Sequence, residues 1–175
     1  GGARAEQLAR SSTALGLALQ SERGAALGDV FAFLSSLYFR GKLTYAAQFG
    51  ATTLQVPGVL VITPGHGLCR PGTRIRAAEL ARIGQIDVSL SNPGFVQPLL
   101  RDAAVLARSV PADAQVVLLG SIATPTYVAP LLSVLGEQLL FPSEFVGRGD
   151  MSRGGLLLRA AREKRELLCV PVQAA

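Results

Sequence analysis

Three loops rich in Gly and Pro hold most of the side chains in this sequence that can do chemistry. They are residues 63–71, 120–125 and 142–155, and each follows a short apolar run typical of a β-strand. In an open α/β sheet, ligands bind beyond the carboxyl ends of the strands. That rule selects these three loops as the positions where a ligand would bind.

The loop at residues 142–155 has the densest set of reactive groups. Arg148 or Arg153 can clamp a phosphate or carboxylate, and Ser152 adds a hydroxyl. Glu144 or Asp150 can bind a ribose hydroxyl or act as a catalytic base. The alternative is structural: an internal Arg–Asp network that orders the loop, with Asp150 or Ser152 capping the next helix.

The loop at residues 63–71 contains the single histidine, His66, between two glycines. The glycines leave the imidazole accessible, which favours a general base or a hydrogen-bond donor. The alternative is a turn histidine that caps a backbone carbonyl. Cys69 is a weaker candidate nucleophile, because the sequence shows no base that would orient it.

The loop at residues 120–125 follows the clearest apolar run in the chain. Gly120 allows close approach of a ligand, and the hydroxyls of Ser121 and Thr124 can meet a phosphate at the start of the following helix. Neither GxGxxG nor a Walker motif is present, so the loop is not a standard dinucleotide site or P-loop. The alternative is that both hydroxyls are ordinary helix caps.

A largely apolar helix is predicted at residues 29–49, and it carries Arg40, Lys42 and Tyr45. Arg40 and Lys42 are candidate ligand-binding residues on a fourth wall of the site; the alternative is that they extend to solvent from a helix end. Gly41 is unusual there, because glycine inside a helix costs about 1 kcal/mol relative to alanine. Close approach by another backbone or by a ligand would explain it.

The remaining elements alternate between helices and strands. Helices are predicted at residues 3–20, 77–83, 98–109, 127–135 and 156–164, and strands at 59–62, 116–119, 138–141 and 166–172. This order predicts an α/β fold: a small, mostly parallel sheet flanked by helices in a Rossmann-like three-layer arrangement. Residues 1–24 are expected to form an N-terminal helix or appendage, and residues 25–175 a single α/β domain. A sheet of four strands is small, so a homodimer is possible.

Composition narrows the function classes. Of 175 residues, 49% are hydrophobic and 17% charged, enough for a sizeable core and too apolar for a disordered chain. No apolar run is long enough for a membrane span, and no export signal opens the chain, so we expect a cytoplasmic protein. The net charge of +5 is spread without a dense basic run, which makes nucleic acid the weakest partner class. One His and two isolated Cys form no metal pattern, although Mg²⁺ beside a phosphate is possible at Glu144 and Asp150.

Two segments resemble bacterial families. The Tyr-containing stretch at residues 35–46, followed by a Val-rich strand and the Gly67-Leu68-Cys69 turn, resembles the YaaA-like α/β domains, an uncharacterised bacterial family, over about residues 35–120. The stretch at residues 145–155 is similar to a signature block of a bacterial family of unknown role. The resemblance implies a Rossmann-like sheet and a nucleotide-type ligand.

Two function hypotheses follow. The first is a protein that binds a nucleotide, nucleoside or sugar phosphate and hydrolyses or transfers a glycosyl or phosphoryl group. Its anion would contact Arg148, Arg153 and the Gly120–Thr124 turn, while His66 or Glu144 supplies acid–base chemistry. The alternative is a non-enzymatic subunit whose apolar helices and basic loop dock a partner protein.

Overall fold

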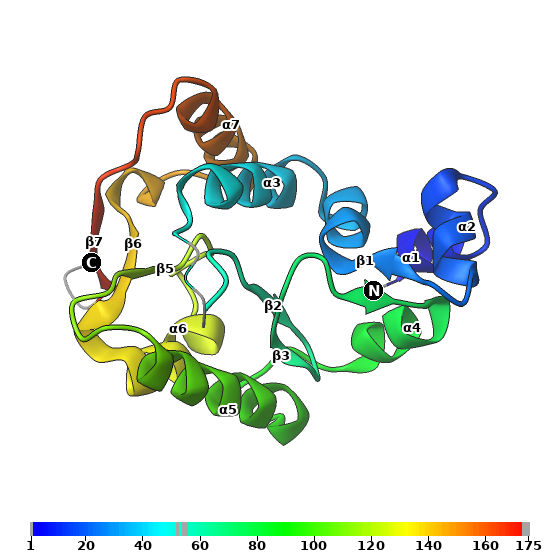
Figure 1. Cartoon of the computed structure of the whole chain (residues 1–175), viewed down its shortest axis with the longest axis horizontal. Helices are drawn as coiled ribbons and strands as arrows, with labels where there is room; N and C mark the ends of the chain where they lie inside the picture. The colour runs from blue at the N-terminus through cyan, green and yellow to red at the C-terminus, as the bar shows by residue number, and fades with distance from the viewer. Residues whose placement is uncertain (1, 52, 54–55, 173–175) are drawn as a thin grey trace.

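The computed structural model describes residues 2–51, 53 and 56–172 of the chain. Helices dominate it, and the longest, α3 (Leu27–Phe49), runs between the N-terminal helices and the C-terminal half of the molecule (Figure 1). The other helices are α1 (Ala3–Ala9), α2 (Ala14–Gln20), α4 (Ala77–Gln85), α5 (Pro93–Ser109), α6 (Pro125–Leu135) and α7 (Asp150–Arg162), with 3-10 turns η1 (Gly136–Gln138) and η2 (Ser143–Phe145).

The strands form three separate small sheets in the described part of the chain. Strand β1 (Ala25–Ala26) pairs with β4 (Arg74–Ile75), and β2 (Val61–Thr63) pairs with β3 (Gly67–Cys69), both antiparallel. In the third sheet, β6 (Leu139–Pro142) lies between β5 (Val116–Val117), its parallel partner, and β7 (Cys169–Pro171), its antiparallel partner.

The predicted Rossmann-like, mostly parallel sheet is therefore wrong. The apolar run at residues 59–62 does not join the β5–β6 sheet but turns back on itself as the β2–β3 hairpin. Gly65 and Gly67 have φ of +78° and +77°, and these positive values allow the tight turn of the hairpin. A short apolar run has the same appearance in a hairpin and in a parallel strand, so the pattern alone could not separate them.

Most predicted helices are confirmed in position, with three differences, one of which is that α5 begins at Pro93 rather than at residue 98. The segment at residues 3–20 is divided into α1 and α2, and Thr13 caps α2 by accepting the Gly16 N–H at 3.2 Å. Helix α7 begins at Asp150, so Asp150, Ser152 and Arg153 lie on a helix rather than in the predicted loop. The sequence suggested a loop there because Gly154 and Gly155 are poor helix formers.

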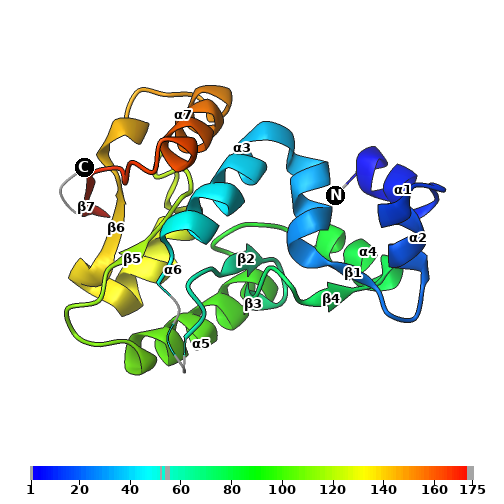
Figure 2. The same cartoon turned by 45° about the horizontal axis from the view of Figure 1, so that its top comes forward.

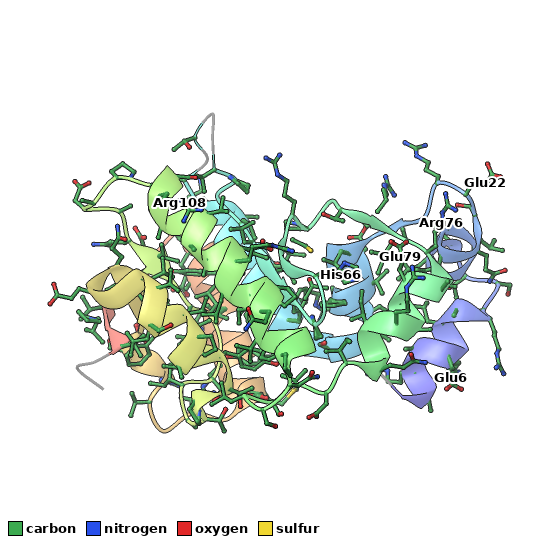
Figure 3. The ribbon with its side chains drawn as sticks, turned by 90° about the horizontal axis from the view of Figure 1, so that it is seen from below. Glu6, Glu22, His66, Arg76, Glu79 and Arg108 are labelled. Carbon is green, nitrogen blue, oxygen red and sulfur yellow. The ribbon has the colours of Figure 1, made fainter. Side chains whose placement is uncertain are left out.

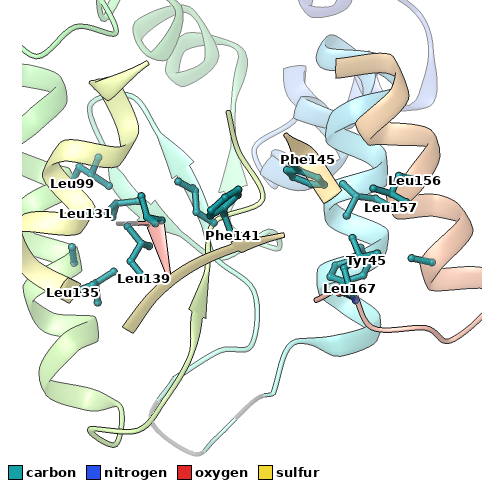
Figure 4. Packing of buried hydrophobic residues seen from close by; sticks show 14 of the residues in the cluster. Tyr45, Leu99, Leu131, Leu135, Leu139, Phe141, Phe145, Leu156, Leu157 and Leu167 are labelled. Carbon is teal, nitrogen blue, oxygen red and sulfur yellow. Dashed lines mark hydrogen bonds between the residues drawn. The ribbon is translucent and has the colours of Figure 1, made fainter. Parts of the chain in front are cut away.

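Two hydrophobic cores hold these elements together. The larger lies between α3, α5, α6, β6 and α7, with Phe141 between the side chains on α5 and α6 and those near α3 and α7 (Figure 4). The smaller unites α1, α2 and α4 with the start of α3, and its fully buried members include Leu8, Leu19, Leu27 and Val30. Strand β2 joins the two, since Val61 belongs to the smaller core and Ile62 packs against the larger. The predicted domain division at residue 24 stays a prediction.

The β2–β3 hairpin is attached to α5 by one carboxylate. Asp102 accepts the Leu68 N–H at 2.9 Å and pairs with Arg101 at 2.7 Å. Burial alone would raise the pKa of Asp102, but the hydrogen bonds from Arg101 and Leu68 outweigh it and hold the pKa below its ordinary value. The carboxylate therefore stays ionised and keeps the hairpin in place.

Tyr45 attaches the C-terminal segment to α3. Its hydroxyl accepts the Leu167 N–H at 2.8 Å, and its side chain is 4% exposed. We expect Tyr45→Phe to lower the free energy of unfolding by about 1–2 kcal/mol, because a buried N–H loses its acceptor. Urea denaturation followed by circular dichroism measures this. Tyr127→Phe is the control, since the half-buried Tyr127 ring packs on Phe95 and its hydroxyl makes no hydrogen bond within the described part of the chain; equal losses in both variants would contradict the role of Tyr45.

Helices α3 and α7 cross in unusually close contact (Figure 2). A Cβ on Gly41 would lie 2.7 Å from the Gly154 carbonyl oxygen, and a Cβ on Gly154 would lie 3.0 Å from the Tyr38 Cα. Both contacts are to backbone, which cannot rotate away. The close approach expected at Gly41 is thus made by another backbone.

Across the described residues, no helix combines the length and apolar character that a membrane span requires.

Candidate functional site

The α3–α7 crossing gathers two cations and two aromatic rings. Tyr38 and Lys42 are four residues apart on α3 and so share one face. Phe145, on η2, and Arg153, on α7, pack against that face. We call Tyr38, Lys42, Phe145, Asp150 and Arg153 the Lys42–Arg153 cluster. Its Tyr38 and Phe145 ring centroids are 6.4 Å apart in edge-to-face geometry.

Arg153 is the buried cation of the cluster, with 9% of the residue exposed. Its Nε donates to the Phe145 carbonyl at 3.2 Å, and its guanidinium lies 5.7 Å from the Phe145 ring centroid. Its only carboxylate partner in the described chain is Asp150, 3.6 Å away, whose side chain is 69% exposed. The guanidinium is thus far more buried than the one carboxylate that opposes its charge.

Lys42 is the second cation, and its Nζ lies 4.2 Å from the Tyr38 ring centroid. No carboxylate of the described residues lies within ion-pair distance of it. Burial lowers the pKa of Lys42 below its ordinary value; the charge of Asp150 opposes the shift, and that of Arg153 adds to it. Lys42 therefore loses its proton more readily than a lysine in water does.

Tyr38 connects this cluster to the loop after β5. Its hydroxyl donates to the Leu119 carbonyl at 3.4 Å. Burial raises the pKa of Tyr38, so the phenol stays protonated. Figure 2 shows the segment between β5 and α6 rising toward α3 and α7. The candidate residues Gly120, Ser121 and Thr124 lie one, two and five residues after Leu119 in the chain.

The loop hydroxyls themselves make only local contacts. Ser121 Oγ accepts the Ala123 N–H at 3.3 Å, and Thr124, at the N-cap position of α6, makes no side-chain capping bond. A Cβ on Gly120 would meet only the Leu118 side chain, at 3.3 Å. Capping by Thr124 is therefore not observed, and the Thr124 hydroxyl is exposed.

The Glu144–Ser152 segment forms an internal hydrogen-bond network. This agrees with the alternative interpretation of the loop at residues 142–155, in which its polar groups order the loop. Arg148 Nε donates to the Glu144 carbonyl at 2.8 Å, and its guanidinium donates to Ser152 Oγ at 3.2 Å. The Glu144 carboxylate is paired with Arg165 at 3.1 Å. Glu144 is therefore occupied by a salt bridge, whereas Arg148 stays exposed at the surface before α7.

The first predicted loop and Arg40 lie apart from the cluster. His66 is exposed at the turn of the β2–β3 hairpin, close to the end of α4 (Figure 3), where the neighbouring Gly65 faces Ile86. Among the described residues, no hydrogen bond, ion pair or ring contact joins His66 to Lys42 or Arg153. Burial raises the pKa of Cys69, which disfavours its thiolate. Arg40 is exposed, two residues from Lys42 and so on another face of α3.

Tyr38 and Phe145 were not predicted as site residues. The available signal was the spacing of Tyr38 and Lys42, which places a ring and an ammonium side by side on a helix. In the described ranges, no group of three or more His, Cys, Asp or Glu side chains can hold a metal ion. Two surface hollows of about 300 and 270 Å³ lie elsewhere, one between α1 and α4 and one beside residues 112–115 and 137–140.

No protein-family model matches the chain, and no curated protein or solved structure is significantly similar to it. The case for a function therefore rests on the cluster itself.

The position of Lys42 predicts a measurable effect on stability. We expect Lys42→Met to raise the free energy of unfolding by about 1 kcal/mol at pH 7, because it removes a buried charge that lacks an ion pair. The pKa of Lys42 is lower in the folded than in the unfolded chain, so the unfolded chain binds more protons between the two values. The wild type therefore gains stability relative to the variant as the pH rises toward the unfolded value.

Urea denaturation of both proteins at neutral and alkaline pH tests this, with the exposed Arg40→Met as control. If Lys42→Met is less stable than the wild type, the Lys42 ammonium stabilises the fold through its contact with the Tyr38 ring.

Proposed function

We propose that this protein binds a phosphate-bearing small molecule, such as a nucleotide or a sugar phosphate, at the Lys42–Arg153 cluster. The observation that carries the proposal is the charge imbalance: Lys42 and Arg153 share one carboxylate, Asp150, which is mostly exposed and 3.6 Å from Arg153. Proteins seldom bury cations without matching charge. An anionic ligand would supply that charge.

Three neighbouring features support phosphate as the anion. Arg148 is exposed just before α7, and guanidinium binds phosphate with paired hydrogen bonds. Gly147 and Gly149 have open space where a Cβ would be, so a ligand could approach their backbone. No side chain caps the α7 N-terminus at Gly149, leaving its N–H groups and the positive end of the helix dipole for an anion.

We do not propose the hydrolase or transferase reaction, for which the acid–base group would be Glu144 or His66. Glu144 is paired with Arg165, and His66 lies on the hairpin beside α4. The proposed function is therefore binding, and the exposed Asp150 is the carboxylate that remains beside the ligand.

The test is a thermal-shift screen, followed by calorimetry, with inorganic phosphate, nucleotides, nucleosides and sugar phosphates. We expect phosphate-bearing compounds to raise the melting temperature and nucleosides to have no effect. Lys42→Met is expected to weaken binding by about ten-fold or more, the loss of one charge-assisted contact, while Arg40→Met binds as wild type does. Equal binding by both variants, or no binding by the wild type, would refute the proposal.

Docking of a partner protein is the second candidate function. Val146, Met151 and Leu168 are exposed at 66%, 65% and 70%, and the first two lie within the Glu144–Ser152 segment. The Leu168 carbonyl accepts the Ser143 N–H at 2.9 Å, which holds the residue before β7 beside η2. Three neighbouring apolar side chains are typical of an interaction surface. Sedimentation of the wild type and of Met151→Ser would test self-association: a mass that does not change with concentration contradicts a homodimer on this surface.

A further inference from the structure

We propose that Lys42 is a reactive amine that forms an imine with a phosphorylated aldehyde or ketone; this deepens the proposed function and rests on it. The geometry that points to this is a half-buried amine against the Tyr38 ring, beside Arg153 and without a carboxylate in ion-pair contact among the described residues. Binding alone does not account for an amine at this position.

The choice of lysine is informative because the chain otherwise avoids it. Lys42 and Lys164 are its only lysines among 17 basic residues. Arginine binds phosphate better through its paired donors and keeps its charge when buried. A lysine can lose its proton and act as a nucleophile, which an arginine cannot do. The cluster thus has arginines that can hold a phosphate and one amine that can react.

The surroundings of Lys42 make it easier to form the neutral amine that carbonyl addition requires. Desolvation is the largest effect on its pKa, and the charge of Arg153 acts in the same direction. Asp150 opposes them from the exposed side of the cluster. Lysines desolvated or placed beside another cation are the ones that serve as imine-forming amines.

The reaction balances without any further reagent. The Nζ lone pair attacks the carbonyl carbon, and the carbonyl oxygen takes a proton, which gives a carbinolamine. Loss of water from the carbinolamine then forms the C=N bond, and the oxygen leaves with two protons. Addition of water reverses both steps, so the imine is in equilibrium with free carbonyl compound.

Lys164 provides an internal control, since it is exposed just after α7 and has the same chemistry. The full chain is incubated at neutral pH with limiting pyridoxal 5′-phosphate as the phosphorylated aldehyde, or with pyridoxal, which lacks the phosphate. Borohydride then reduces the imine to a stable secondary amine, and peptide mass spectrometry measures the label at Lys42 and Lys164.

We expect about ten-fold more label on Lys42 than on Lys164, because charge-assisted contacts from the neighbouring arginines would hold the phosphate of the probe beside Lys42. Pyridoxal should label Lys42 less, inorganic phosphate should protect it, and Lys42→Arg should remove the label while the melting temperature stays near that of wild type. Equal or greater labelling of Lys164, or labelling of Lys42 that phosphate does not reduce, overturns the inference. If phosphate raises the melting temperature but Lys42 is not labelled, the imine is wrong and the binding function stands; if phosphate has no effect on either readout, the binding function fails as well.

Discussion

Gly67→Ala is expected to lower the free energy of unfolding by about 2–5 kcal/mol. Two costs combine at this position. Its φ of +77° is strained for an L-residue by about 1–2 kcal/mol. The added Cβ would also lie 2.5 Å from the Pro98 carbonyl oxygen and in direct overlap with the Asp102 carboxylate, and such overpacking costs about 1–3 kcal/mol.

Gly65→Ala separates these two costs. Gly65 has nearly the same φ, +78°, but its Cβ would meet only the flexible Ile86 side chain, at 3.1 Å. The free energy of unfolding of this variant should fall only by the cost of the strained backbone, about 1–2 kcal/mol. Urea denaturation of both variants measures the difference, and proteolysis of the β2–β3 hairpin reports its detachment from α5. Equal losses in the two variants would mean that the contact of Gly67 with α5 contributes nothing.

The glycines beside His66 show what the sequence could and could not reveal. Their spacing correctly indicated a turn after the apolar run at residues 59–62. Their purpose was interpreted as access to the imidazole, whereas Gly67 allows the hairpin to contact Pro98 and Asp102 on α5. A contact between segments so far apart leaves no trace in local composition, and for the same reason the hairpin was mistaken for a parallel strand.

The candidate site was predictable in part, for a similar reason. Lys42 and Arg153 were both selected from the sequence, because polar groups in an apolar helix and arginines among glycines are local signals. The two residues lie close together because α3 and α7 cross, and local sequence patterns do not encode that crossing. His66 was selected by its chemistry and lies elsewhere, since its predicted position depended on the parallel sheet that the chain does not form.

Gly41→Ala is expected to lower the free energy of unfolding by about 2 kcal/mol, although alanine is the better helix former by about 1 kcal/mol. The reason is the 2.7 Å separation between the new Cβ and the Gly154 carbonyl oxygen, which belongs to rigid backbone. Helices α3 and α7 would have to move apart. That movement would separate Lys42 from Arg153 and would also weaken phosphate binding.

Gly155→Ala is the matched control, one residue after Gly154 on the same helix, with nothing within 4 Å of its new Cβ. It should raise the free energy of unfolding by about 0.5–1 kcal/mol, because it gains helix propensity without a clash. Opposite changes in the free energy of unfolding of the two variants follow only if the backbones of α3 and α7 are in contact. Phosphate affinity should then fall for Gly41→Ala alone. A stabilised Gly41→Ala variant would mean that the helices are not in contact at this position, and the cluster that depends on their crossing would lose its basis.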